Sequence, residues 1–153
     1  MQNITKKYDV LIVGAGPAGS NAAISYKELN PSLRVGLIDK ATFPRDKSCG
    51  DAIGPGVISA LKRFNNEHIL ENEPQVVSTT LYGPDNIGIQ NYIPEVKNKE
   101  DSIVYVIPRI DLDNRILNLA KDLDVDVTEG LSFVSFEEKP NKNIHVKFKN
   151  KDE

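Results

Sequence analysis

The start of the chain alternates between short apolar runs and a segment with helical spacing. Residues 10–13 (VLIV) form a continuous apolar run, typical of a strand covered on both faces. Residues 18–29 carry small side chains where a helix would approach a sheet, and Asn30-Pro31 ends this segment, because a residue before proline resists helical geometry. A second apolar run follows at residues 33–38. This order predicts a βαβ unit over residues 8–39.

The middle of the chain has weaker patterns. We expect a short helix at residues 57–64 and a loop at residues 65–74. Two strands are predicted at residues 76–81 and 87–93, because the turn signal Gly-Pro-Asp-Asn at residues 83–86 separates them.

The last part of the chain again combines strands with a helix. Residues 102–107 have the composition of a strand, and residues 111–123 carry leucine and isoleucine at helical spacing. A short strand is predicted at residues 125–127. Residues 133–136 and 144–148 alternate apolar with polar side chains, which predicts a hairpin.

The segment between the first strand and the first helix has glycines in the G-x-G-x-x-G spacing. A dinucleotide site needs a tight turn, close approach of the backbone to a pyrophosphate, and close packing of helix on strand. The free N–H groups of the helix and its dipole would face the diphosphate. Proline in the first helical turn loses no intrahelical hydrogen bond. The predicted binding residues here are Gly14, Ala15, Gly16, Pro17, Ala18 and Gly19.

An acidic residue, Asp39, ends the second apolar run. At this position a carboxylate would accept hydrogen bonds from the adenosine ribose hydroxyls, and it disfavours a 2′-phosphate. The alternative is an ordinary tight turn with a surface aspartate. Because strand, glycine turn, helix, strand and acid occur in the order of a βαβ unit, we favour the dinucleotide interpretation.

Composition narrows the remaining choices. The 153 residues are 39% hydrophobic with a net charge of −3, which suits one globular core and argues against nucleic acid as the main partner. No apolar run approaches the roughly 20 residues that span a bilayer. A single cysteine excludes an intrachain disulfide and favours a reducing, cytoplasmic location. His68 and His145 lack metal-ligand spacing, so we expect surface histidines and no metal site.

The loop at residues 40–51 (KATFPRDKSCGD) carries the cations Lys40 and Arg45, which suit a pyrophosphate. Its residues 43–51 resemble the F-P-R-D-K-x-C-G-D loop of the geranylgeranyl reductase family of FAD-dependent oxidoreductases. That family lies in the larger group with para-hydroxybenzoate hydroxylase-like monooxygenases and flavin-dependent halogenases. Ala52 replaces a glycine that relatives often have. The resemblance implies FAD as cofactor, with Arg45 near the diphosphate and Cys49, Gly50 and Asp51 towards the ring system.

Residues 104–123 (VYVIPRIDLDNRILNLAKDL) resemble the same family's strand, arginine and (F/L)-D-x-x-L helix. The resemblance implies that Arg109 reaches the flavin from the amino end of the helix. A cation there is unfavourable for the helix dipole, which also suggests an anionic partner. The alternative is a solvated arginine.

Cys49 has two interpretations. A thiol beside a flavin could take part in chemistry if Arg45 or Lys47 lowered its pKa. Most lone cysteines are inert, however, so we favour a packing role.

The resemblance covers nearly the whole chain but only the first part of the family. The G-A-D-G motif that relatives carry downstream does not occur in these residues. We therefore expect an α/β fold: a truncated, N-terminal part of a Rossmann-like FAD/NAD(P)-binding domain. Its expected parts are a βαβ core (8–39), a flavin loop (40–51), a β-rich insertion (about 75–108), a strand–helix–strand unit (103–128) and a terminal hairpin (131–149).

The expected function is that of the intact family, an FAD-dependent reductase or monooxygenase acting on an apolar or aromatic small molecule. The electrons would come either from NAD(P)H or from a partner reductase, and the catalytic residues are unknown. Peripheral membrane contact and a partner chain that supplies the missing part stay open. The alternatives are a non-catalytic ADP- or FAD-binding fragment and a flavin-dependent halogenase. An NAD-dependent dehydrogenase is disfavoured, because the loop at residues 43–51 has no role there.

Overall fold

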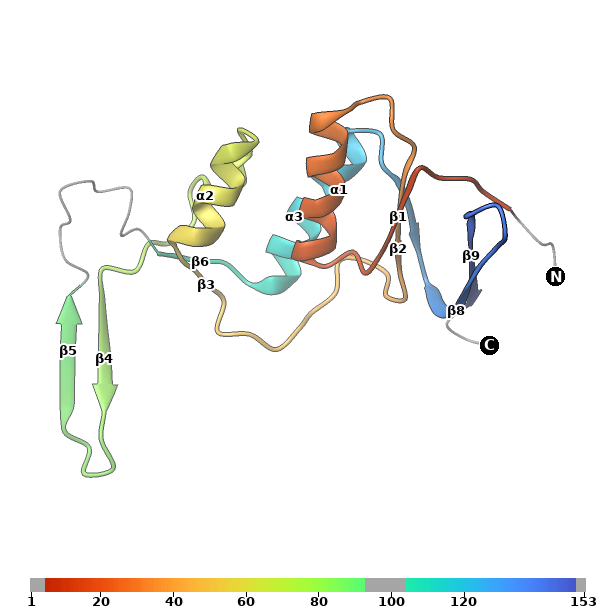
Figure 1. Ribbon diagram of the computed structural model, residues 1–153. Coiled ribbons are helices and arrows are strands. Elements are labelled where there is room, and N and C mark those ends of the chain that lie inside the picture. Colours follow the sequence, from red (N-terminus) through yellow and green to blue (C-terminus); the bar gives the residue numbers. More distant parts are fainter. Residues whose placement is uncertain (1–4, 93–103, 151–153) are drawn as a thin grey trace. The chain divides into compact units, whose positions relative to one another are not determined.

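The computed structural model describes residues 5–92 and 104–150 and divides into two compact units (Figure 1). Unit 1 comprises Met1–Asp46 and Ile110–Glu153, and unit 2 comprises Lys47–Arg109. The end of the predicted strand 87–93, the start of the strand 102–107 and part of the expected insertion lie outside the described residues.

A parallel sheet of three strands forms the centre of unit 1. Its order is β1 (Val10–Val13), β2 (Val35–Asp39) and β7 (Asp126–Glu129), and both neighbouring pairs run parallel. The α/β fold and the βαβ arrangement predicted from the sequence are confirmed. The acidic residue Asp39 ends the central strand, at the same edge of the sheet as the turn that follows β1.

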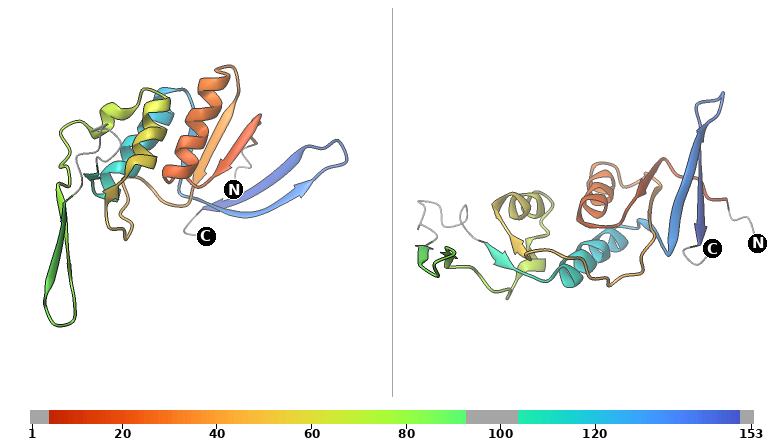
Figure 2. Two further views of the ribbon diagram at one scale, coloured as in Figure 1. Left: turned by 60° about the vertical axis from the view of Figure 1, so that its left-hand side comes forward. Right: turned by 90° about the horizontal axis from the view of Figure 1, so that it is seen from below.

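The two helices α1 (Pro17–Leu29) and α3 (Arg109–Asp122) lie on one side of β1 and β2 in Figure 1, and the β8–β9 hairpin lies on the other side. The same separation is visible from the directions of Figure 2. Within α3 the side chains of Leu112, Ile116 and Leu117 are buried at helical spacing. Their periodicity is the reason that residues 111–123 were predictable as a helix.

The two strands of the βαβ unit are buried to different extents. All five residues of β2 are buried, because this strand lies between β1 and β7. In β1 no residue is fully buried, and Val13 is 52% exposed. The expectation that residues 10–13 are covered on both faces is therefore wrong. An apolar run indicates that a strand can be buried, but it does not show whether other segments cover both faces of that strand.

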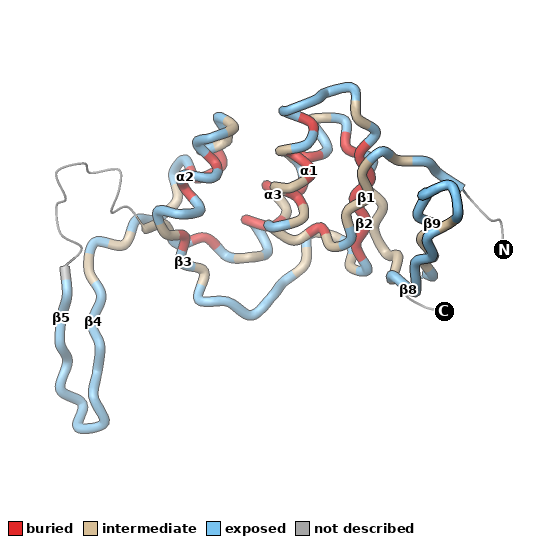
Figure 3. Tube along the Cα trace, viewed as in Figure 1, coloured by how far each residue is buried: buried red, intermediate tan, exposed pale blue. Residues whose placement is uncertain are grey.

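A hairpin ends unit 1. It consists of β8 (Leu131–Glu138) and β9 (Ile144–Asn150), which pair antiparallel and extend beyond the strands predicted from alternation. The rings of Phe133 and Phe148 meet edge to face, with centroids 6.2 Å apart. Most of the hairpin is exposed, whereas the buried residues of unit 1 concentrate in the sheet and its helices (Figure 3).

Unit 2 has a small core between a helix and short strands. Helix α2 (Pro55–Arg63) is followed by the 3₁₀ helix η1 (Glu67–Leu70), while β3 (Ala52–Ile53) pairs antiparallel with β6 (Tyr105–Val106). Among the described residues of this unit, the buried apolar side chains are those of Ile53, Ile58, Leu61, Ile69, Leu70 and Ile107.

Two local predictions for unit 2 need correction. The helix begins at Pro55 and not at residue 57, because proline is well suited to the first helical turn. The segment 65–74, expected as a loop, contains η1, whose Ile69 and Leu70 are buried in the core. The strands predicted at residues 76–81 and 87–93 form a hairpin of β4 (Ser78–Tyr82) and β5 (Gly88–Tyr92), with bounds that differ by one or two residues where residues are described.

Candidate functional site

The turn between β1 and α1 depends on two glycines. Gly14 has a φ of 104°, a conformation that L side chains rarely adopt, and its N–H donates to the carbonyl oxygen of Ile38 over 2.7 Å. A Cβ on Gly19 would overlap the carbonyl oxygen of Gly14, so helix and turn approach each other closely only because this atom is missing. Two positions of the G-x-G-x-x-G pattern thus have a physical reason to be glycine.

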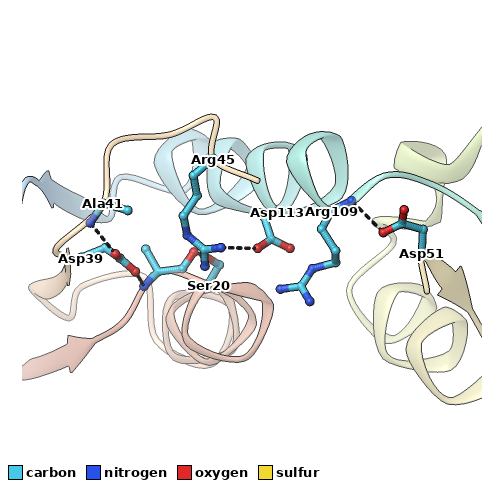
Figure 4. Close-up of polar contacts among 8 residues, drawn as sticks. Ser20, Asp39, Ala41, Arg45, Asp51, Arg109 and Asp113 are labelled. Carbon is cyan, nitrogen blue, oxygen red and sulfur yellow. Dashed lines mark hydrogen bonds and ion pairs between the residues drawn. The ribbon is translucent and has the colours of Figure 1, made fainter. Parts of the chain in front are cut away.

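The carboxylate of Asp39 joins this turn to the end of β2. Its Oδ2 accepts a hydrogen bond from the backbone N–H of Ala15 over 2.6 Å, and its Oδ1 accepts one from the N–H of Ala41 over 2.8 Å (Figure 4). Asp39 is 8% exposed. Because an ionised carboxylate has about four acceptor positions, these two bonds leave acceptor capacity on both oxygens.

Ser20 fixes the same turn from the helix side, and sequence reasoning missed it. The buried Ser20 hydroxyl donates to the carbonyl oxygen of Ala15 over 3.0 Å, so the N–H and the C=O of Ala15 are both held by side chains. The available signal was a serine near the start of a helix whose residues 18, 19, 22 and 23 are small and apolar.

The guanidinium of Arg45 lies next to the glycine turn. Its Cζ is 4.9 Å from the centre of the Phe43 ring, and a Cβ on Gly16 would lie 3.3 Å from its Nη2. Its Nη1 is 3.5 Å from Oδ2 of Asp113, a residue of α3 that is fully buried (Figure 4). Sequence reasoning predicted Arg45 and missed Asp113.

The first part of the loop at residues 40–51 is tied to β7. The N–H of Phe43 donates to Oε2 of Glu129 over 2.8 Å, and Oε1 of Glu129 is 3.0 Å from Nζ of Lys121. Glu129 was not predicted as a site residue either. Lys40, which was predicted, is exposed.

In unit 2, the turn at Cys49–Asp51 is held by the second half of the chain. Asp51 has a φ of 55°, in the left-handed region that aspartate tolerates better than most residues. Its carbonyl oxygen accepts the N–H of Ile107 over 3.0 Å, and its Oδ1 accepts the N–H of Arg109 over 3.3 Å. Asp51 therefore provides an acceptor for the backbone N–H of the first residue of α3, because the N–H groups in the first turn of a helix have no acceptor within the helix.

Cys49 is exposed, so the expectation that it fills a buried space is wrong. Its pKa lies below the ordinary value for a thiol, first because the backbone N–H of Asp51 can donate to the sulfur, and second because the Arg109 guanidinium can do so. These contacts stabilise the thiolate, which is the nucleophilic form of cysteine.

The structure brings the predicted residues together in two groups. In unit 1 Asp39 contacts Ala15 of the glycine turn, and Arg45 lies beside Gly16 of the same turn. In unit 2 the turn Cys49–Asp51, which includes Gly50, lies against Arg109. Their role in holding a cofactor stays a prediction at this point.

No group of three or more histidine, cysteine, aspartate or glutamate side chains in residues 5–92 and 104–150 could hold a metal ion. Among the helices of those same residues, none has the length and the apolar composition needed to cross a membrane.

Proteins of known name resemble the chain over most of its length. It is 34% identical over 114 residues to a menaquinone reductase of Mycolicibacterium smegmatis, an alignment that covers 74% of the chain and 27% of the relative. It is 48% identical over 100 residues to a geranylgeranyl diphosphate reductase of Rhodobacter capsulatus, covering 62% of the chain and 23% of the relative. No family model matches the chain.

The solved structures agree with the sequence matches. A geranylgeranyl bacteriochlorophyll reductase-like protein of Thermoplasma acidophilum superimposes with a TM-score of 0.73 at 25% identity, covering 95% of this chain and 36% of that structure. The chain thus spans about a quarter of the length of its curated relatives and about a third of this structure. Over most of its length, the chain is therefore similar to one part of proteins named menaquinone and geranylgeranyl reductases, which confirms the resemblance seen in its sequence.

Proposed function

We propose that this chain binds the ADP half of FAD, as part of an FAD-dependent oxidoreductase. The observation that carries the proposal is the hydrogen bond between Asp39 and the N–H of Ala15, because it joins a glycine turn to an acid at the carboxyl edge of a parallel sheet. Ligands of open α/β sheets bind at that edge.

Each group in unit 1 has a defined part in this proposal. The first N–H groups of α1 have no partner within the helix, and together with its dipole they attract the diphosphate. The Arg45 guanidinium beside Gly16 adds charge-assisted hydrogen bonds. The remaining acceptor positions of Asp39 receive the ribose hydroxyls.

Unit 2 supports the proposal through its own group of residues. Family resemblance assigns Cys49, Gly50, Asp51 and Arg109 to the ring side of the cofactor, and Lys40 to its neighbourhood. When bound, FAD supplies the redox chemistry, while the protein orients it and controls access to it. The low thiol pKa and the anchored Asp51 are features of this chain that suit such a polar environment.

The names of the relatives support a substrate class for the intact protein. One relative is named for menaquinone and another for geranylgeranyl diphosphate, and both are called reductases. We propose reduction of a small molecule with an isoprenoid-like part, with NAD(P)H as electron donor. A cytoplasmic location is likewise proposed, on the basis of the single cysteine.

A flavin fluorescence titration of the purified chain, with ADP as competitor, tests the proposal. We expect saturable FAD binding with a dissociation constant in the micromolar range that ADP competes away. Gly16→Val and Asp39→Ala should abolish it, because the first fills the space beside Arg45 and the second removes the acceptor of the Ala15 N–H. Gly56→Ala, in α2, serves as control, since a Cβ there meets no atom within 4 Å. A folded chain that binds neither FAD nor ADP would contradict the proposal.

A further inference from the structure

The Arg45 guanidinium is held by three neighbours in unit 1. The ring of Phe43 lies against its face at 4.9 Å, the carboxylate of Asp113 lies 3.5 Å from its Nη1, and a Cβ on Gly16 would lie 3.3 Å from its Nη2. Its side chain is 23% exposed. The two terminal nitrogens thus face different partners, one a carboxylate and the other the glycine turn.

Asp113 is an unusual residue in its position. It is fully buried and lies on the face of α3 that also buries Leu112, Ile116, Leu117 and Ala120. A carboxylate in such surroundings costs free energy unless it is paired, and replacing a buried ion pair by apolar residues is often neutral or stabilising. Packing alone therefore gives no reason for an acid here.

We propose that Asp113 is a positioning residue that holds the Arg45 guanidinium over Gly16, so that Nη2 is presented to the diphosphate of the bound nucleotide. This inference rests on the proposed function. Asp113 has no contact with the cofactor in this proposal. Its carboxylate holds one terminal nitrogen of the planar Arg45 guanidinium, and the ring of Phe43 holds the plane of that group. A guanidinium held in this way loses less side-chain entropy when it binds an anion.

A carboxylate beside an arginine also has an opposite effect. Its negative charge competes with the diphosphate for the same cation and repels it. If competition dominated, removal of the charge would tighten nucleotide binding, whereas positioning predicts that binding weakens. The sign of the change therefore separates the two effects.

The test measures ADP and adenosine binding to the full chain by calorimetry. Asp113→Asn keeps the shape of the side chain and removes its charge, and we expect it to weaken ADP binding about tenfold, the size of one charge-assisted contact. Adenosine binding should be unchanged, because adenosine has no diphosphate. Arg45→Gln should have the same effect, and the double variant should bind ADP no more weakly than either single variant.

Asp111→Asn is the matched control, since it removes the same charge from the exposed side of α3. We expect unchanged ADP affinity for this variant. Tighter or unchanged ADP binding in Asp113→Asn, or effects of Asp113 and Arg45 that add, would overturn the inference. Weakening of ADP and adenosine to the same degree would do so too, because it would indicate a general disturbance of the fold.

Two measurements keep the inference testable if Asp113→Asn unfolds or the nucleotide does not bind. Phe43→Leu removes the ring from the guanidinium and keeps the buried acid, and it should also lower the preference for ADP over adenosine. The NMR signal of the Arg45 Nε–H in the free chain should be shifted from that of a solvated arginine in the wild type and return towards it in Phe43→Leu. A solvated signal in the wild type overturns the inference, whereas a shifted signal in a chain that binds no nucleotide refutes the proposed function.

Discussion

The carboxylate of Asp39 accepts the backbone N–H of Ala15 over 2.6 Å, although the two residues are 24 positions apart in the sequence. This bond connects the turn after β1 with the end of β2, and the second oxygen of Asp39 accepts the N–H of Ala41. One side chain therefore sets the geometry of two neighbouring loops, and its structural role can be measured separately from any role in binding.

Asp39→Asn should destabilise unit 1. An asparagine amide keeps one acceptor but turns an NH₂ group towards a backbone N–H, and leaving a buried donor unsatisfied costs about 1–3 kcal/mol. We expect a loss of this size in the free energy of unfolding, measured by chemical denaturation. Asp122→Asn, at an exposed position of α3, should change it by less than about 0.5 kcal/mol. An unchanged midpoint for Asp39→Asn would contradict the role of its two hydrogen bonds.

Gly19→Ala should be poorly tolerated. The added methyl group overlaps the carbonyl oxygen of Gly14, a backbone atom that cannot rotate away. Overpacking of this kind typically costs about 1–3 kcal/mol, and thermal unfolding would report it. Gly56→Ala, where the space is open, should instead be neutral or stabilise α2 by up to about 1 kcal/mol. Equal melting temperatures for the two variants would show that the close approach of α1 to the turn is not required.

Asp9 should add an acid-dependent component to stability. Hydrogen bonds from Arg34 lower the pKa of the Asp9 carboxyl to about 2. Because this value is below that of the unfolded chain, about 3.9, the contribution is present above pH 4 and is lost as the pH falls through about 2. NMR titration of the carboxyl carbon gives the pKa directly.

The matched variant for that titration is Asp9→Asn. Its free energy of unfolding should fall less steeply than that of the wild type between pH 4 and pH 2, and added salt should reduce the difference, because the pair is exposed. A carboxyl that titrates near 4 in the folded chain would refute the prediction.

Cys49 should react with iodoacetamide at a lower pH than an ordinary thiol. The Asp51 N–H and the Arg109 guanidinium lower its pKa from the usual 8.5 or so. Arg109→Gln removes the second of these causes, so the midpoint of the pH–rate profile should move upward without reaching that of a free thiol. Arg63→Gln, on exposed α2 surface, is the control. A midpoint that does not respond to Arg109→Gln would exclude the contact.

The elements that could be predicted from the sequence are those with strong local signals. The βαβ unit has apolar runs, a glycine turn and a proline that ends the helix, and β1, α1 and β2 follow within a few residues of the expected bounds. Where burial depends on distant segments, the sequence was less informative. Ile69 and Leu70 are too short a run to predict η1, and the openness of β1 depends on which strands lie beside it.

The candidate site shows the same division. Gly14, Gly19 and Asp39 were predictable because their geometry arises within one βαβ unit. Asp113 comes from α3, and its pairing with Arg45 depends on tertiary packing that no local pattern contains. The acid on the apolar face of a helix was nevertheless a usable signal, since such residues are rarely buried without a partner.

The hydrogen bonds of Asp51 affect which parts of unit 2 can change in length among related proteins. Its carbonyl and carboxylate oxygens receive the N–H groups of Ile107 and Arg109, and β3 pairs with β6, so the chain leaves and returns at one anchored place. Doubling the length of a flexible loop between fixed ends costs only about 0.6 kcal/mol. The exposed turn between β4 and β5 can therefore be lengthened or exchanged at little cost, while the turn that carries Cys49 keeps its shape.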